Sequence, residues 1–251
     1  MEFSIVIPAH MKSTRLPNKV LVDIGGRPML WRVWDQIRPF VSHQRLFVAT
    51  DSPEIVSLVT KWGGQALLTP ACRSGTERAA AVVDQLVGDF IVNVQADELN
   101  VGPLLLAELV RTGSECPEAD LITPVFRITE TDVLMDSSVV KVVRGHDGRA
   151  LYFSRAAVPY FRDAPVDSWV DRCEYWGHIG VYGYRRDVLL SYRDLPESSL
   201  EDAERLEQLR YLEAGYRIHT FVTEHRPESI NTPHDLWRVR GAIHTTQRDT
   251  Q

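Results

Sequence analysis

The first hundred residues contain four short apolar runs with a helical segment after each of the first three, and this alternation constrains the fold more than any other feature. Apolar runs at 3–8, 45–50, 66–69 and 89–94 are typical of strands buried on both faces. Segments at 28–39, 53–62 and 76–87 read as the helices between them. Such alternation predicts parallel strands joined by right-handed crossovers. We therefore expect an α/β fold with a doubly wound, mostly parallel sheet.

Unusual polar segments follow each of these predicted strands, at 8–19, 50–51, 69–78 and 95–98. In open α/β sheets, ligands bind beyond the carboxyl ends of the strands. The four segments would therefore lie along one edge of the sheet, where we expect an active site.

The second half has a more mixed pattern. It predicts strands at 120–128, 139–143, 150–154, 178–184 and 217–222, a polar loop at 159–176, and helices at 201–214 and 232–243. The 251 residues fit one large domain with a smaller mixed portion.

The loop Ser13-Thr14-Arg15-Leu16-Pro17-Asn18-Lys19 combines hydroxyl side chains with two cations. A polyphosphate needs cations and free N–H groups, which such a loop supplies, although it is not a P-loop. Arg15 can donate to two phosphate oxygens, while Lys19 acts as a point charge. A solvated surface loop is the alternative interpretation.

Two further segments have a possible chemical role. In Gln95-Ala96-Asp97-Glu98, a carboxylate at a strand end can hold Mg²⁺, which takes one or two carboxylates plus substrate phosphates. The alternative is a solvated turn. In Arg73-Ser74-Gly75-Thr76-Glu77-Arg78, Gly75 permits close approach of a base or ribose, while a helix N-cap is the alternative.

Four polar residues interrupt apolar segments of the second half: Arg155, His178, Glu207 and Gln208. Each alone is more often structural, but together they could line a pocket for a polyhydroxylated acid.

Composition excludes several classes of protein. A net charge of −6 and a pI near 5.8 provide no basic field for nucleic acid. No apolar stretch approaches the roughly 18 residues that span a bilayer. The start of the chain lacks signal-peptide features, and its three cysteines have no metal-ligand spacing. We expect a reduced, cytoplasmic protein that binds no nucleic acid and no membrane.

Ten segments resemble, in order, those of the 3-deoxy-manno-octulosonate cytidylyltransferases. They are IPAHMKSTRLPNK (7–19), IGGRPML (24–30), VATD (48–51), SGTER (74–78), VNVQADE (92–98), VKVV (140–143), ALYFSRA (150–156), HIGVYGYRR (178–186), LEQLRYLEAG (206–215) and INTPHDL (230–236).

The resemblance implies a Rossmann-like, glycosyltransferase-A-like nucleotidyltransferase that couples CTP to 3-deoxy-manno-octulosonate (KDO) with Mg²⁺, for lipopolysaccharide or capsule synthesis. Residues 1–115 would mainly bind nucleotide, 116–222 would mainly bind the sugar acid and form a homodimer, and 223–251 would close the fold.

The resemblance also implies residue roles. Catalytic residues would be Arg15, Lys19 and Asp97. Nucleotide ligands would be Ala9, His10, Ser13, Thr14, Arg15, Lys19, Ser74, Gly75, Arg78 and Asp97. Sugar-acid ligands would be Gln95, Arg155, His178, Tyr182, Glu207 and Gln208. Metal ligands would be Asp97 and Asn231.

The chain departs from the family pattern in places. His10 replaces an arginine, Ala96 and Leu99 replace glycine and proline around Asp97-Glu98, and Asn231 replaces an aspartate. Two alternatives therefore remain: a cytidylyltransferase for a modified or secondary-pathway acid such as 8-amino-KDO, and a catalytically weakened nucleotide-binding paralogue.

Overall fold

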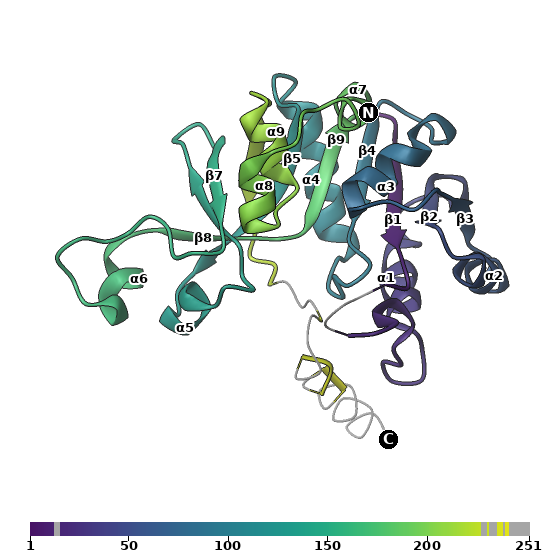
Figure 1. Cartoon of the computed structure of the whole chain (residues 1–251), viewed down its shortest axis with the longest axis horizontal. Helices are drawn as coiled ribbons and strands as arrows, with labels where there is room; N and C mark the ends of the chain where they lie inside the picture. Colours follow the sequence, from purple (N-terminus) through teal and green to yellow (C-terminus); the bar gives the residue numbers. More distant parts are fainter. Residues whose placement is uncertain (13–15, 227–229, 231–234, 238, 241–251) are drawn as a thin grey trace. The chain divides into compact units, whose positions relative to one another are not determined.

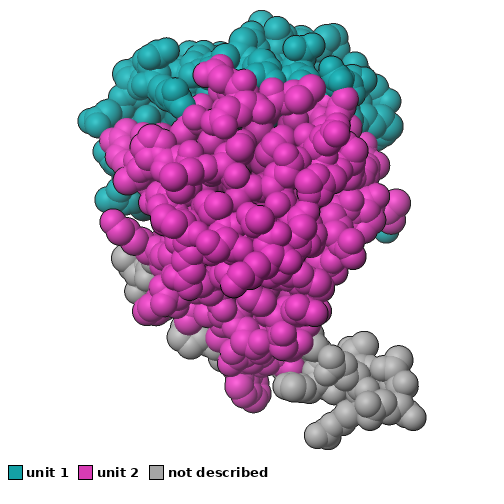
Figure 2. Space-filling view, turned by 90° about the vertical axis from the view of Figure 1, so that its right-hand side faces the viewer, with its two compact units in different colours: residues 1–2, 88–92, 108–226 teal, residues 3–87, 93–107, 227–251 magenta. Residues whose placement is uncertain are grey.

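The computed structural model describes residues 1–12, 16–226, 230, 235–237 and 239–240 (Figure 1). These residues form an α/β fold that divides into two compact units, coloured separately in Figure 2. Unit 2 consists of residues 3–87, 93–107 and 227–251. Unit 1 consists of residues 1–2, 88–92 and 108–226. Strand β4 (Phe90–Val94) and helix α4 (Pro103–Glu115) each have residues in both units.

Unit 2 contains the alternating elements predicted from the first part of the chain. They are β1 (Phe3–Ala9), α1 (Met29–Ile37), β2 (Leu46–Thr50), α2 (Pro53–Lys61), β3 (Gln65–Leu68) and α3 (Gly75–Val82). Strand β2 pairs in parallel with both β1 and β3, which confirms the predicted parallel pairing. All residues of β2 are buried, as expected for a strand covered on both faces.

Helix ends in this unit follow local capping chemistry. The Ser52 hydroxyl accepts a hydrogen bond from the Ile55 N–H at 3.4 Å, and Pro53 occupies the first turn of α2. Gly63, with φ of 80°, ends that helix in the left-handed conformation. Helix α3 ends at Val82 and continues as a 3₁₀ turn to Gln85, short of the predicted end at residue 87.

Unit 1 has the mixed pairing expected of the second half. Strand β5 (Leu121–Ile128) pairs antiparallel with β8 (Tyr175–His178) and β9 (Val181–Arg185), and parallel with β10 (Ile218–Val222). Strand β6 (Lys141–Arg144) pairs antiparallel with β7 (Ala150–Ser154) and β8. The helices of this part of the chain are α5 (Thr131–Met135), α6 (Trp169–Arg172), α7 (Arg186–Ser191), α8 (Ser199–Glu204) and α9 (Gln208–Glu213).

Two predicted elements of unit 1 are wrong as single segments. The helix expected at 201–214 is broken between α8 and α9, because Arg205 takes a left-handed conformation with φ of 54°. The strand expected at 178–184 is divided by a turn in which the Val181 N–H donates to the Ile179 carbonyl at 2.7 Å. The polar loop expected at 159–176 contains α6 and the start of β8.

The closing helix predicted at 232–243 lies partly outside the described residues, although 235–237 and 239–240 are helical. Within the described part of the chain, no helix is long and apolar enough to cross a membrane.

Candidate active site

A lysine and an aspartate meet at the carboxyl ends of the strands of unit 2. Lys19 opens a short 3₁₀ turn after Asn18, whose φ is 53°. Asp97 follows β4 in a turn closed by the Glu98 N–H on the Gln95 carbonyl at 3.2 Å. The Lys19 ammonium donates to the Asp97 carboxylate, and the two side chains retain 13% and 26% exposure. A cation and a carboxylate are therefore paired within reach of a ligand at this edge.

His10 lies in the same electrostatic environment, one residue after the buried Ala9 that ends β1. Loss of water around the ring lowers the pKa of His10, and Arg78 and Lys19 act in the same direction, while Asp51 and Asp97 oppose them. The charges of the predicted nucleotide site thus gather around this imidazole. The His10 imidazole is therefore more often neutral than a histidine with an ordinary pKa.

Arg78 has a different environment from the one its predicted role suggests. It is 2% exposed, and its guanidinium donates to the Thr69 hydroxyl at 2.6 Å and lies 3.3 Å from an Asp51 carboxylate oxygen. Buried cations are found where they are paired and hydrogen-bonded. Arg78 therefore ties α3 to the ends of β2 and β3, and its contact with nucleotide stays a prediction.

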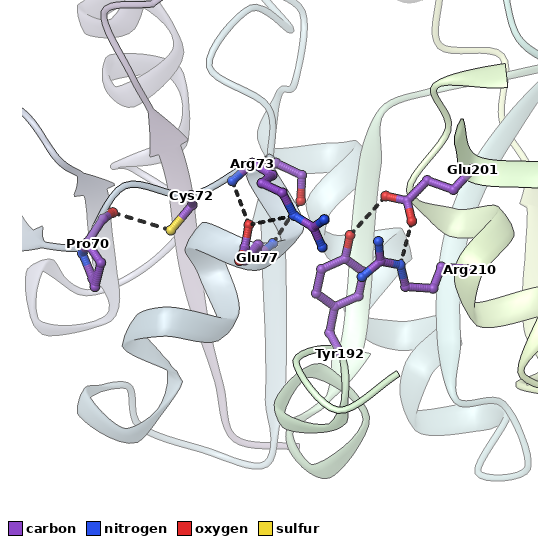
Figure 3. Close-up of polar contacts among 8 residues, drawn as sticks. Pro70, Cys72, Arg73, Glu77, Tyr192, Glu201 and Arg210 are labelled. Atoms are coloured by element: carbon purple, nitrogen blue, oxygen red, sulfur yellow. Dashed lines mark hydrogen bonds and ion pairs between the residues drawn. The ribbon is translucent and has the colours of Figure 1, made fainter. Parts of the chain in front are cut away.

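The start of α3 places Gly75 against Gln95. The Ser74 hydroxyl caps α3 by accepting from the Glu77 N–H at 3.1 Å, and the Glu77 carboxylate accepts from the Arg73 N–H at 2.5 Å (Figure 3). A Cβ on Gly75 would lie 3.0 Å from the Gln95 side-chain oxygen. Gly75, a predicted nucleotide-binding residue, and Gln95, a predicted residue of the sugar-acid site, therefore lie against each other.

Asp97 is a suitable ligand for a hard divalent cation. No group of three His, Cys, Asp or Glu side chains that could hold a metal occurs among the described residues. Mg²⁺ does not require such a cage, because it binds through one or two carboxylates, substrate phosphates and water. The Asp97 carbonyl accepts from the N–H of Ile230 at 3.4 Å. Ser13, Thr14, Arg15 and Asn231 lie outside the described residues.

The predicted sugar-acid residues of the second half lie in unit 1. His178 ends β8, and its ring contacts the rings of Phe153 and Tyr182 at centroid distances of 5.3 and 5.1 Å. Burial lowers the pKa of His178 to about 3, so its imidazole is neutral at pH 7. Its Nε2 lies 2.9 Å from the Thr123 hydroxyl.

Arg155 follows β7 and is engaged by backbone carbonyls. Its guanidinium donates to the carbonyls of Glu204 at 2.7 Å, Ser137 at 3.1 Å and Arg205 at 3.5 Å. The carbonyls of residues 204 and 205 belong to the break between α8 and α9, so Arg155 stabilises that break. The contact of Arg155 with the sugar acid stays a prediction.

Gln208 opens α9 directly after Glu207, its N-cap residue, and is 5% exposed. Among the described residues, its amide nitrogen is buried without a hydrogen-bond partner. Helix α8 is joined to α9 by Glu201, whose carboxylate accepts from Arg210 and from the Tyr192 hydroxyl (Figure 3). The buried amide nitrogen of Gln208, which has no hydrogen-bond partner among the described residues, is a candidate for binding a ligand.

Sequence reasoning did not identify several partners of these residues. Asp51 and Thr69 hold Arg78, Thr123 contacts His178, and Lys141 donates to the Arg155 carbonyl at 2.6 Å. Asp51 and Lys141 lie in segments that resemble those of the family, VATD and VKVV. The pattern of a segment does not show which side chain, distant in sequence, each of these residues contacts.

Known proteins similar to this chain share both sequence and structure with it. The cytidylyltransferase family model matches residues 4–218. The 3-deoxy-manno-octulosonate cytidylyltransferase 2 of Actinobacillus pleuropneumoniae serotype 5b is 41% identical over 96% of this chain and 98% of its own length. The 3-deoxy-manno-octulosonate cytidylyltransferase of Polynucleobacter asymbioticus is 42% identical over 98% of this chain and 97% of its own.

One solved structure supports the same family, and a second shares only the fold. CMP:2-keto-3-deoxy-manno-octonic acid synthetase complexed with CTP has a TM-score of 0.88 and 36% identity, covering 98% of this chain and 100% of its own. HddC from Yersinia pseudotuberculosis, at 15% identity and a TM-score of 0.69 over 96% of this chain and 100% of its own, shares the fold. On these grounds the chain belongs to the 3-deoxy-manno-octulosonate cytidylyltransferase family of nucleotidyltransferases.

Proposed function

We propose that this protein couples CTP to KDO, giving CMP-KDO and pyrophosphate. The observation that carries the proposal is the Lys19–Asp97 ion pair, since Asp97 lies two residues after Gln95, whose side chain lies against Gly75. That arrangement would supply a phosphate-binding cation and a metal-binding carboxylate close to a glycine that would let a nucleotide approach the backbone.

The reaction is an in-line displacement at the α-phosphorus of CTP. The oxygen of the sugar's anomeric 2-hydroxyl forms the new bond, the hydroxyl loses its proton, and the bond to the bridging oxygen of pyrophosphate breaks. Lys19, together with Arg15, would offset the negative charge that develops on pyrophosphate. Positioning and charge neutralisation account for most catalysis of such transfers.

Enzymes that transfer groups from nucleoside triphosphates generally use a divalent metal, and we propose Mg²⁺ on Asp97, with Asn231 as a second ligand. When bound, Mg²⁺ polarises the phosphate and orients the reacting groups. The hydrogen bond from Ile230, which precedes Asn231 in sequence, to the Asp97 backbone supports this pairing. Lys19, the present partner of the Asp97 carboxylate, would turn toward phosphate oxygens.

The sugar acid would be bound by Gln95, Arg155, His178, Tyr182, Glu207 and Gln208. The buried, unpartnered amide nitrogen of Gln208 supports this, because a carboxylate or hydroxyl oxygen of the acid would supply its missing acceptor.

A pyrophosphate-release assay tests the function. Each of the four common ribonucleoside triphosphates is combined with Mg²⁺ and with KDO, 8-amino-KDO or a nine-carbon keto acid. We expect release chiefly with CTP and KDO. Preference for 8-amino-KDO would identify the modified-acid alternative, and nucleotide binding without release would identify a weakened paralogue.

Gly75→Ala is expected to raise the KM for the sugar acid roughly tenfold. Its Cβ would lie 3.0 Å from Oε1 and 3.1 Å from Nε2 of Gln95, so that amide must move. Overpacking of this kind costs about 1–3 kcal/mol, and about 1.4 kcal/mol is tenfold in affinity. Steady-state kinetics with each substrate varied would measure it.

Gly102→Ala is the matched control, because a Cβ at Gly102 would meet nothing within 4 Å. If both variants had wild-type KM values for the acid, Gln95 would not be a ligand of the acid.

Asn231→Asp is expected to lower the Mg²⁺ concentration needed for half-maximal turnover. An added carboxylate raises the affinity of an oxygen site for a hard cation. Metal titrations with KDO and 8-amino-KDO would also detect the other possible result, a change in substrate preference. Unchanged metal demand and preference would show that residue 231 does not reach the metal.

We further propose a homodimer formed through the β7 region of unit 1. Strand β7 lies at the end of its row of strands, and the nearby sequence exposes Leu151 at 50% and Tyr160 at 76%. An exposed strand at the end of a row and large exposed apolar side chains are each features of interaction surfaces, and sedimentation analysis would test the stoichiometry. A cytoplasmic location also stays a prediction.

A further inference from the structure

Thr123 is a buried residue of β5 whose hydroxyl has more acceptors than it can serve. Its Oγ1 lies 2.8 Å from the Val181 carbonyl, 3.3 Å from the Ile179 carbonyl and 2.9 Å from Nε2 of His178. A hydroxyl has one hydrogen to donate, and a carbonyl oxygen can only accept. The short distance to Val181 assigns that hydrogen to its carbonyl.

The tautomer of His178 follows from this assignment. Because the Thr123 hydrogen is used by a carbonyl, the contact with Nε2 is a hydrogen bond only if Nε2 carries a hydrogen and Oγ1 accepts. A neutral imidazole has one N–H, so Nδ1 then presents a lone pair. The described residues give Nδ1 no hydrogen-bond partner, and His178 keeps part of its surface accessible.

The environment of the ring keeps this arrangement over a wide pH range. The backbone N–H of His178 donates to the Val140 carbonyl at 2.8 Å, and the rings of Phe153 and Tyr182 both contact the imidazole. Burial lowers the pKa of His178 to about 3, so protonation does not compete near neutral pH. The imidazole is therefore an acceptor and not a cation.

We infer that Thr123 is a positioning residue, which holds His178 as the Nε2–H tautomer so that Nδ1 accepts a hydrogen bond from a hydroxyl of the sugar acid. The identity of the ligand rests on the proposed function, whereas the tautomer does not. An unprotonated nitrogen repels a carboxylate and selects an O–H donor. His178 thus recognises a hydroxyl, and the acid's carboxylate must be bound by other groups.

Two-bond ¹H–¹⁵N spectra of protein labelled in histidine would test the tautomer without substrate. His178→Gln identifies the His178 signals among the eight histidines. We expect a protonated Nε2 and an unprotonated Nδ1 in wild type and in Thr123→Ser. Thr123→Val, which lacks the acceptor for Nε2–H, should give a mixture of tautomers. A protonated Nδ1 in wild type, or an unchanged tautomer in Thr123→Val, would overturn the assignment.

Kinetics and binding test the hydroxyl. Loss of one oriented hydrogen bond should raise the KM for KDO roughly five- to tenfold in Thr123→Val, with the KM for CTP within about twofold of wild type. Thr112→Val, which removes the hydroxyl of another buried threonine in α4, is the matched control and should match wild type.

Saturating KDO should also shift the Nδ1 resonance of the wild-type protein upfield. If CTP and KDO release pyrophosphate but the Nδ1 resonance and the KM for KDO do not respond, the hydroxyl contact is wrong. If no acid gives pyrophosphate, the proposed function fails, while the spectra of the free protein still decide the role of Thr123.

Discussion

Asp97→Asn is expected to lower turnover by roughly two to three orders of magnitude, the size of effect seen when one preorganised electrostatic group is removed. The amide keeps the shape of the side chain but removes the charge that pairs with Lys19 and that we propose binds Mg²⁺. Pyrophosphate release under saturating CTP and KDO would measure the loss. A raised Mg²⁺ concentration should restore little of it, because the amide is a weak ligand for a hard cation.

Asp35→Asn is the control for this substitution. Asp35 also pairs with a cation, Arg38 at 2.6 Å, but on an exposed surface where such pairs contribute little. It should leave turnover unchanged. If Asp97→Asn kept a tenth or more of the wild-type rate, Asp97 would not be the metal ligand.

Lys141→Met is expected to cause the largest loss of stability among single substitutions considered for this chain. Lys141 is 0% exposed, and its ammonium donates to the carbonyls of Asp136, Val139 and Arg155 at 2.9, 2.7 and 2.6 Å. Burial lowers the pKa of Lys141 to about 8, which leaves it charged at pH 7. Methionine keeps the apolar stem of the side chain but is one heavy atom shorter and takes this donor away from all three carbonyls.

The Asp136 carbonyl keeps the Val139 N–H as a donor at 3.2 Å. Each of the other two carbonyls, if left unsatisfied, costs about 1–3 kcal/mol, and relief of the buried charge offsets part of that sum. We expect a net loss of about 2–4 kcal/mol in the free energy of unfolding. In a chain of this size, that lowers Tm by about 4–16 °C, which calorimetry would measure. Lys61→Met, at an exposed position of α2, is the control and should have the Tm of the wild-type protein. Equal melting of both variants would show that the three hydrogen bonds contribute no net stability.

The alternating half of the fold could be predicted because its determinants are local. Apolar runs such as residues 46–50 predict buried strands, and Ser52-Pro53 and Gly63-Gly64 indicate the two ends of α2. Helix α4 was not predicted, although Pro103 at its start and the buried Leu105, Leu106 and Leu109 provided a signal. The break at Arg205 had no such signal, since an arginine is a good helix former.

The site was predictable to the level of segments and less so to the level of contacts. The alternation of strands with helices and the polar segments after each strand indicated one edge for the segments of Lys19 and Asp97, and the two side chains form an ion pair. Thr123 and His178 are 55 residues apart in sequence, and only folding brings them together. The capping role of Ser74 was left open beside its nucleotide role, and the cap is present.

The central claim is that the chain joins CMP to the anomeric oxygen of KDO. ³¹P NMR of a reaction containing protein, CTP, Mg²⁺ and KDO tests it most directly, because the product's phosphodiester and free pyrophosphate have separate resonances. We predict equimolar growth of these two resonances at the expense of CTP, only when KDO is present. Hydrolysis of CTP to CMP, or no consumption of CTP with KDO, would contradict the account.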